Sequence, residues 1–111
     1  LQVRDFNYID DVIEVLLMVA AHDAADGQIY NLGSDDPINL LNLARLLIEV
    51  NNSGAFELIP FPDDRKRIDI GDYYGDYRKI RSKLGWRPVV GLRDGLTRTL
   101  AYFREHLEHY V

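Results

Sequence analysis

The chain has 111 residues, a net charge of −5 at pH 7 and a hydrophobic fraction of 47%, which is the size and composition of one globular domain. It contains no cysteine, which excludes disulfide bonds and thiolate metal sites and fits a reducing, cytoplasmic location. The longest apolar run, residues 12–21, is too short to span a bilayer, so we expect no membrane partner.

The first third of the chain predicts two strands around one helix. Residues 1–9 place Val, Phe, Tyr and Ile in loose alternation and predict a strand. Asp10 is a natural N-cap for a helix over residues 11–21, and Asp11 would lie in its first turn, where the helix dipole favours a carboxylate. This helix carries apolar residues around most of its own circumference, so other parts of a protein must cover it on more than one side. Residues 28–32 predict a second short strand.

The rest of the chain predicts three further helices and one more strand. Asn39 is a good N-cap for the first of these helices, and Asp76 for the second. Gly85 suits the C′ position that ends the second helix. The last helix places leucines and a phenylalanine on one face. The expected ranges are helices over residues 40–50, 77–84 and 92–109, and a strand over residues 56–59.

Residues 65–88 are positively charged, although the chain as a whole is acidic. They hold eight of the 13 Lys and Arg residues but three of the 18 Asp and Glu residues. Such a segment indicates an anionic partner: a nucleic acid, a membrane surface or a phosphorylated small molecule. The triple Arg65-Lys66-Arg67 with a nearby carboxylate suits a nucleotide diphosphate. A nucleic-acid binder is usually basic as a whole, and this chain is not.

Common catalytic and metal-binding motifs do not occur in the sequence. It has no G-x-G-x-x-G, no P-loop and no G-x-S-x-G, and no Tyr is followed four residues later by Lys. His106 and His109 sit near the end of the last helix without a nearby third ligand, so a solvated helix end is the better interpretation than a metal site. We therefore expect no catalytic residue and no metal.

Four motifs, in order, nevertheless resemble one family. They are similar to R-D-F-x-Y-V-D-D-V, to Y-N-I-G-S-G followed by P-x-S-L-x-E-L-A, to D-x-S-K-x followed by L-G-W-x-P, and to L-x-E-G-L. All are typical of extended short-chain dehydrogenase/reductases that act on nucleotide sugars, the UDP-glucose 4-epimerase-like proteins among them. The residues that carry the resemblance are 4–12, 30–34, 37–41, 76–80, 84–88 and 92–96.

The resemblance implies an α/β fold that is the C-terminal part of such an enzyme. It would comprise a strand and helix at the edge of a Rossmann sheet, followed by a small, mainly helical substrate-binding subdomain. Residues 1–111 would form this single portion, without the N-terminal Rossmann domain. In the family that missing domain binds NAD or NADP and carries the catalytic Tyr and Lys. We therefore expect NAD as the cofactor of the parent protein, and neither NAD binding nor turnover by these residues alone.

The resemblance also implies which residues contact the substrate, a nucleotide diphosphate sugar. Arg4 matches an arginine that contacts the diphosphate, although taken without the resemblance it is better explained by a surface ion pair to Asp5. Arg65 matches a second arginine that contacts the same phosphates from a later loop. Asp69 matches the acidic residue that bonds the ribose. Because the spacing in this loop is one residue longer than in the common R-P-G-D form, Arg67 stays a candidate beside Arg65.

Two other interpretations remain. The chain can act as a non-catalytic C-terminal module whose apolar first helix drives self-association or domain exchange, and a homo-oligomer is expected in either case. Tyrosines at positions 73, 74 and 77 are also of the kind that stacks single-stranded bases, but packing against the last helix explains them equally well.

Overall fold

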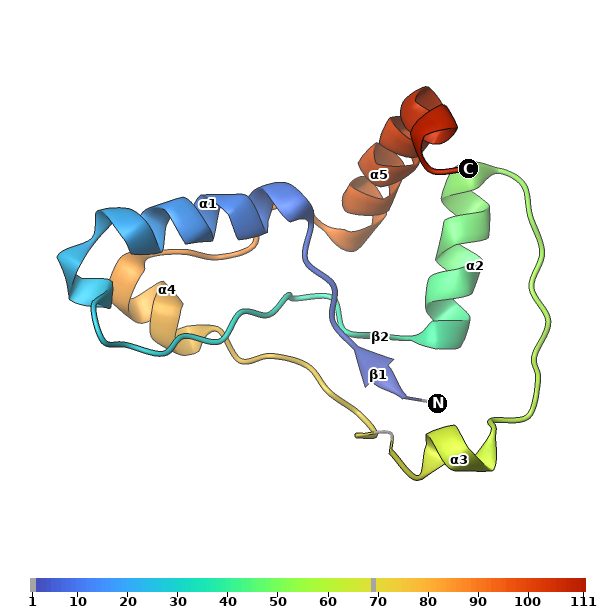
Figure 1. The fold of residues 1–111 in the computed structure, drawn as a ribbon, viewed down its shortest axis with the longest axis horizontal. Coiled ribbons are helices and arrows are strands. Elements are labelled where there is room, and N and C mark those ends of the chain that lie inside the picture. Colours follow the sequence, from blue (N-terminus) through green and yellow to red (C-terminus); the bar gives the residue numbers. More distant parts are fainter. Residues whose placement is uncertain (1, 69) are drawn as a thin grey trace.

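The structure is a computed structural model that describes residues 2–68 and 70–111 (Figure 1). Helices dominate it, and two short strands form its sheet, β1 (Val3–Arg4) and β2 (Ile38–Asn39). The strands are antiparallel, with Val3 opposite Asn39 and Arg4 opposite Ile38. The helices are α1 (Ile9–Ala21), α2 (Leu40–Asn51), α3 (Asp63–Lys66), α4 (Arg78–Leu84) and α5 (Leu92–His106), with 3₁₀ turns at Asp23–Ala25 and Leu107–His109.

The elements are arranged in an open shape. Figure 1 shows α1 beside α4 on one side and α2 beside α5 on the other, with the strands between them. The radius of gyration is 16.8 Å, whereas a compact chain of this length has a value of about 13 Å. The chain therefore leaves surfaces uncovered that a compact globule would bury.

A small apolar core joins α1 to α4 and to the segment after α4. Val15 from α1, Ile80 from α4 and Trp86 are buried against one another. Tyr77 meets the Trp86 ring edge-on, with 5.7 Å between the ring centroids. Gly85, which lets the chain turn from α4 toward Trp86, has φ +75° and ends the helix as predicted. This core holds α4 against one face of α1 and leaves the opposite face of α1 exposed.

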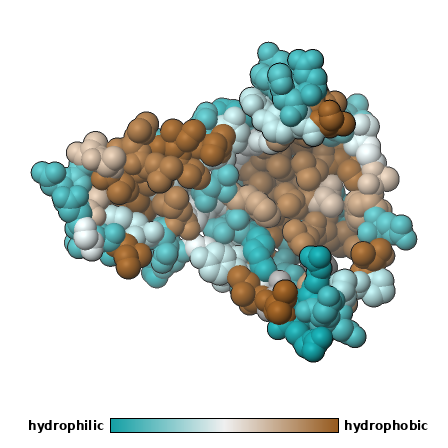
Figure 2. Space-filling model, viewed as in Figure 1, coloured by the Kyte–Doolittle hydropathy of each residue, from teal (hydrophilic) through white to brown (hydrophobic). Residues whose placement is uncertain are grey.

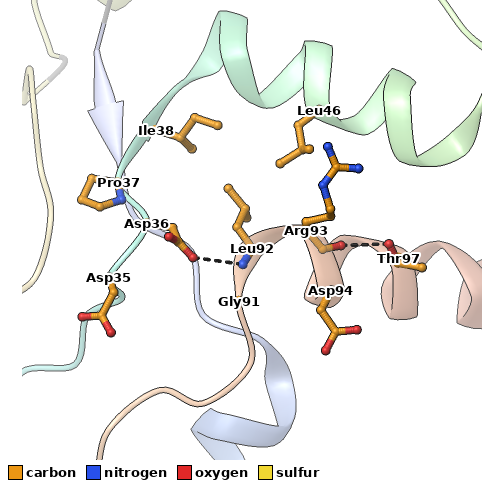
Figure 3. A pocket seen from close by; sticks show the side chains of 10 residues that line it. All are labelled: Asp35, Asp36, Pro37, Ile38, Leu46, Gly91, Leu92, Arg93, Asp94 and Thr97. Atoms are coloured by element: carbon orange, nitrogen blue, oxygen red, sulfur yellow. Dashed lines mark hydrogen bonds between the residues drawn. The ribbon is translucent and has the colours of Figure 1, made fainter.

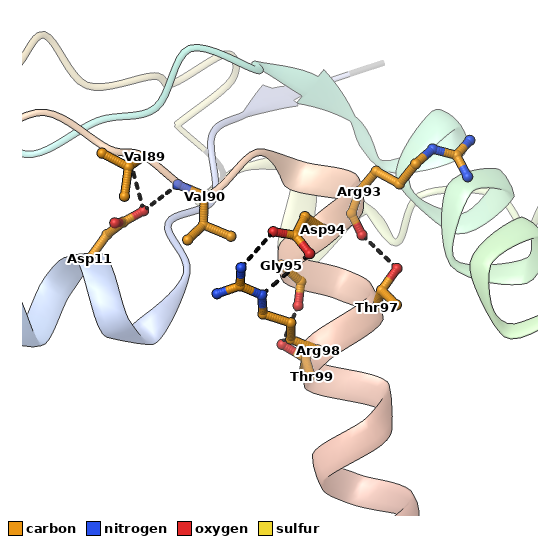
Figure 4. A network of polar contacts seen from close by, with 9 residues as sticks. All are labelled: Asp11, Val89, Val90, Arg93, Asp94, Gly95, Thr97, Arg98 and Thr99. Carbon is orange, nitrogen blue, oxygen red and sulfur yellow. Dashed lines mark hydrogen bonds and ion pairs between the residues drawn. The ribbon is translucent and has the colours of Figure 1, made fainter.

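Asp11 connects the first helix to the segment that leads into α5 (Figure 4). Its side chain is buried, and Oδ2 accepts hydrogen bonds from the backbone N–H of Val89 at 3.2 Å and of Val90 at 3.1 Å. Its backbone oxygen accepts from Nε1 of Trp86 at 3.1 Å. Asp11 lies in the first turn of α1, as predicted, and its side chain bonds a distant segment as well.

The prediction that Asp10 is the N-cap was wrong, because Asp10 lies inside α1 and is exposed. The N-cap of α1 is Tyr8, which makes no side-chain capping bond. The cap of α2 is Asn39, as predicted, and its side chain accepts from the backbone N–H of Asn42 at 2.8 Å. The Asn39 side chain therefore caps its helix, whereas Asp10 does not.

Several predicted ranges differ from the structure. The strand predicted over residues 1–9 is limited to Val3–Arg4 in the described residues, and Ile9 already belongs to α1. Residues 28–32 and 56–59 are not strands, and the last helix ends at His106 before a 3₁₀ turn. The short helix α3 lies where a loop was expected. A strand needs a neighbour for its backbone groups, and within the described residues only β1 and β2 pair.

The outward face of α1 is apolar and exposed. Leu16 is 63% exposed and Leu17 67% exposed, and Figure 2 shows apolar colour over α1 and in a second area between α2 and α5. Patches of this kind mark sites of contact with other protein surfaces. Within the described part of the chain, no helix combines the length and apolar character that a bilayer span requires.

We predict that Asp11→Ala lowers the free energy of unfolding by roughly 2–4 kcal/mol, because it leaves two backbone N–H groups without an acceptor. Urea denaturation followed by tryptophan fluorescence measures the change, since Trp86 lies in the affected core. Asp10→Ala is the matched control, because Asp10 is exposed on the same helical turn. Equal effects of the two substitutions would contradict the role given to Asp11.

Candidate anion-binding site

A hollow of about 660 Å³ lies between β1, the start of α2 and α3. Two arginines from distant parts of the sequence reach it, Arg4 from β1 and Arg65 from α3. Phe6 and Phe61 supply apolar surface at its walls. The full lining is Gln2, Arg4, Asp5, Phe6, Leu40, Phe61, Arg65 and Ile68.

Backbone oxygens orient the Arg4 guanidinium. Its Nη1 donates to the carbonyl of Val3 at 3.0 Å and to the carbonyl of Gly71. Gly71 follows α3 in the sequence, so this bond joins the strand that carries Arg4 to the segment that carries Arg65. Arg4 is half-buried. It is thereby placed at the boundary between the strand and the hollow.

Arg65 is placed by the short helix α3. The Pro62 carbonyl accepts from the backbone N–H of Arg65 at 3.1 Å and of Lys66 at 2.9 Å, which starts the helical turn. Asp63 and Asp64 occupy the first turn, where carboxylates are favoured by the helix dipole. The Arg65 side chain extends from this turn and lines the hollow. Helix α3 therefore begins with negative charges and ends with positive ones, and Arg65 belongs to the positive end.

The candidate phosphate-binding residues lie at different places relative to this hollow. Arg4 and Arg65 line one hollow, whereas Arg67, at the C-terminal cap of α3, is not among its lining residues. Asp69 lies outside the described residues. The arrangement of Arg4 and Arg65 suits one anion with several oxygens, because each guanidinium offers a fork of N–H donors.

Two carboxylates that the sequence analysis did not select lie beside this site. Asp5 accepts from the backbone N–H of Ser34 at 3.0 Å and of Gly75 at 2.9 Å, both through Oδ2. Asp72 accepts from the backbone N–H of Val3 at 2.9 Å. No periodicity in the sequence indicates such bonds. The one signal available was the position of Asp5 directly after Arg4.

A second hollow, of about 870 Å³, lies between the start of α5 and the segment before β2 (Figure 3). Its charged groups are already engaged in holding the fold together. Asp36 accepts from the first backbone N–H of α5, that of Leu92, at 3.1 Å. Arg93 pairs with Glu49 of α2 at 2.7 Å, and Asp94 pairs with Arg98 at 2.9 Å. We therefore regard this hollow as a helix junction.

A sequence model of the family described as GDP-mannose 4,6 dehydratase matches residues 1–99. The chain belongs to this family of NAD-dependent nucleotide-sugar epimerases and dehydratases. It is 35% identical over 115 residues to dTDP-D-glucose 4,6-dehydratase of Bos taurus, covering 99% of this chain and 32% of that protein. It is 36% identical over 110 residues to UDP-glucuronic acid decarboxylase 1 of Xenopus tropicalis, covering 97% of this chain and 24% of that protein.

The fold agrees with that of a solved family member. UDP-glucose 4-epimerase of Thermotoga maritima, determined with UDP-glucose, superposes with a TM-score of 0.82 at 32% identity. The match covers 96% of this chain and 33% of that one. The resemblance to the epimerase/dehydratase family and the α/β fold class are therefore confirmed. The chain spans about a third or less of the length of the relatives it matches.

Asp76 and Arg78 stabilise the turn between the loop after α3 and α4. Asp76 is not the N-cap residue as predicted, because that position is held by Tyr77. It accepts instead from the Arg78 backbone N–H at 3.0 Å and from Nη2 of the Arg78 guanidinium at 2.5 Å. The side-chain hydrogen bond from Arg78 is the main cause that lowers the pKa of Asp76 from 3.8 to about 2.

We predict that Arg78→Ala raises the pKa of Asp76 toward 3.8, as read from an NMR titration of its carboxyl carbon. In the wild type, the stabilisation linked to this pair is present above the unfolded-state pKa and is lost as pH falls toward 2. Arg81→Ala is the control, because Arg81 acts on Asp76 through a weaker charge interaction alone. An equal rise in both variants would argue against the bonded pair as the cause.

Proposed function

We propose that these residues form the substrate-binding part of an NAD(P)-dependent nucleotide-sugar epimerase or dehydratase, in which they bind the substrate diphosphate. The observation that carries this proposal is the meeting of Arg4 and Arg65 at one hollow. Family membership supports it, since relatives are named for reactions of dTDP-, UDP- and GDP-sugars. The absence of cysteine fits a reaction that takes place in the cytoplasm.

Binding energy is the contribution we assign to this site. Two charged fork donors on a diphosphate anchor a part of the substrate that does not react. Anchoring that part orients the sugar toward the reacting groups and lowers the entropic cost of the chemical step. Arg4 is held by backbone carbonyls on a strand, so little side-chain freedom is lost when the phosphate binds. Phe6 and Phe61 supply apolar surface beside the charged contacts.

The residues of this chain do not fit the nicotinamide cofactor. A dinucleotide fold binds pyrophosphate through a glycine-rich turn between a strand and a helix, and the sequence has no G-x-G-x-x-G. It also lacks a Tyr followed four residues later by a Lys. We therefore assign NAD, the hydride transfer and the proton transfer to a polypeptide longer than these 111 residues, and propose that the 111 residues alone are inactive.

One further substrate contact is part of the proposal, and one alternative is kept. Asp69, which lies outside the described residues, is proposed to accept a hydrogen bond from a ribose hydroxyl. Arg67 is the alternative to Arg65 as the second phosphate ligand, and it stands one residue past the end of α3. We prefer Arg65 because it lines the same hollow as Arg4.

We predict that Arg4→Ala and Arg65→Ala each weaken UDP binding to the intact enzyme about tenfold or more, because each removes charge-assisted hydrogen bonds to phosphate. Isothermal titration calorimetry with UDP measures the affinities. Arg67→Ala is the matched control, with the same change of charge outside the hollow, and should change the affinity by less than about threefold. Unchanged affinity in the Arg4 and Arg65 variants would refute the diphosphate site.

A second function is favoured by the exposed apolar face of α1. Leu16 and Leu17 are each more than 60% exposed, and burying such side chains against another copy is favourable by about 1.5–3 kcal/mol each. We propose that the 111-residue chain alone self-associates through this face.

Light scattering after size exclusion tests the self-association directly. We predict that the wild-type chain elutes with more than the 12.8 kDa of one copy, and that the double change Leu16→Glu and Leu17→Glu restores a single copy by adding like charges to the contact. The control places the same two charges at Leu58 and Ile59, which are exposed elsewhere on the chain. A monodisperse wild-type monomer would count against the association.

A further inference from the structure

Asp5 joins three segments that are far apart in the sequence. It follows Arg4 directly, and its Oδ2 accepts from Ser34 at 3.0 Å and Gly75 at 2.9 Å. Beside this carboxylate the two loops are in backbone contact. A Cβ added to Gly75 would lie 1.9 Å from the Leu32 oxygen, and one added to Gly33 would lie 2.5 Å from the Gly75 oxygen. Only glycine at both positions allows the loops to approach closely enough for one oxygen to bond both.

Further bonds fasten the loop after α3 to the strand that carries Arg4. The backbone N–H of Tyr73 donates to the Val3 carbonyl at 2.8 Å, and the N–H of Val3 donates to Asp72 Oδ1 at 2.9 Å. Arg4 itself donates to the Gly71 carbonyl. The segment from Gly71 to Gly75 is thus held against β1 and the residue that follows it by a series of separate hydrogen bonds.

The other side of α3 has no comparable attachment among the described residues. Every residue from 52 to 68 is exposed, and Figure 1 shows the chain between α2 and α3 running along the outer edge of the molecule. The helix that presents Arg65 is therefore held chiefly from its C-terminal side, where the bonds to Asp5 and Asp72 lie. A chain segment gains up to about 3.3–3.6 Å of reach per residue once its anchor is released, so loosening these bonds lets Arg65 move away from Arg4.

We propose that Asp5 and Asp72 are positioning residues that fix the separation between Arg4 and Arg65, and that this separation makes the site select a nucleoside diphosphate over the monophosphate. The inference rests on the proposed function. A diphosphate reaches both arginines only when they stand at a set distance, whereas a monophosphate is satisfied by one of them. Fixing the distance thus affects the ratio of the two affinities more than the affinity for the monophosphate.

The experiment compares UDP and UMP binding by calorimetry on the intact enzyme. Asp5→Ala and Asp72→Ala should each lower the ratio of UDP affinity to UMP affinity about tenfold, mainly through weaker UDP binding. Asp5→Asn should keep most of the wild-type ratio, because the amide oxygen still accepts from the two loops. Alanine and asparagine remove the same negative charge, so their difference reports the hydrogen bonds rather than the electrostatics of the hollow.

Asp76→Ala is the matched control, since Asp76 belongs to the same stretch but bonds Arg78 rather than the strand. It should leave the ratio unchanged. If thermal denaturation shows that the Asp5→Ala protein is not folded, Asp72→Ala is the variant that tests the proposal, because Asp72 is exposed. A folded Asp72→Ala protein with the wild-type ratio would overturn the positioning role and leave the diphosphate site standing. A wild type that binds neither nucleotide, or binds both equally, would refute the proposed function itself.

Discussion

The buried carboxylate of Asp11 is the interaction on which the connection between the two halves of the molecule depends. Its Oδ2 satisfies two backbone N–H groups, and its backbone oxygen receives the Trp86 indole. Buried charge is tolerated in proteins when hydrogen bonds replace water in this way. Through one residue, α1 is joined to the core around Trp86 and to the segment that starts α5. That junction contributes to the placement of α5, together with the bond from Leu92 to Asp36, and α2 packs on α5 in turn.

The candidate site is held differently from the core. Val15, Ile80 and Trp86 pack away from it, and the residues around Arg4 and Arg65 are joined mainly by hydrogen bonds to backbone groups. Such bonds contribute roughly 0.5–1.5 kcal/mol each, so the order of the site rests on several weak, directional contacts. A ligand that spans both arginines adds its own binding free energy to that order. Site geometry and ligand binding are therefore coupled.

Local signals in the sequence predicted the elements that need no distant partner. Asn39 caps α2 through its own side chain, and Gly85 turns the chain after α4 without a Cβ penalty. Residues 28–32 and 56–59 have strand composition but find no strand to pair with among the described residues, since β propensity depends on neighbours. The first-turn position of Asp11 was predictable, but its bonds to Val89 and Val90 were not, because they reach across the fold.

The site shows which of its residues chemistry alone could select and which depend on the fold. Charge and family resemblance pointed to Arg4 and Arg65 as candidates, since guanidinium groups suit phosphate by their own geometry, and the structure places both at one hollow. Asp5 and Asp72 act through their positions in the fold, which sequence spacing does not encode. The structure is open, with a radius of gyration of 16.8 Å, and it leaves the apolar outer face of α1 uncovered. The hollow is thus built from β1, the start of α2 and α3, while the exposed apolar face of α1 lies apart from it.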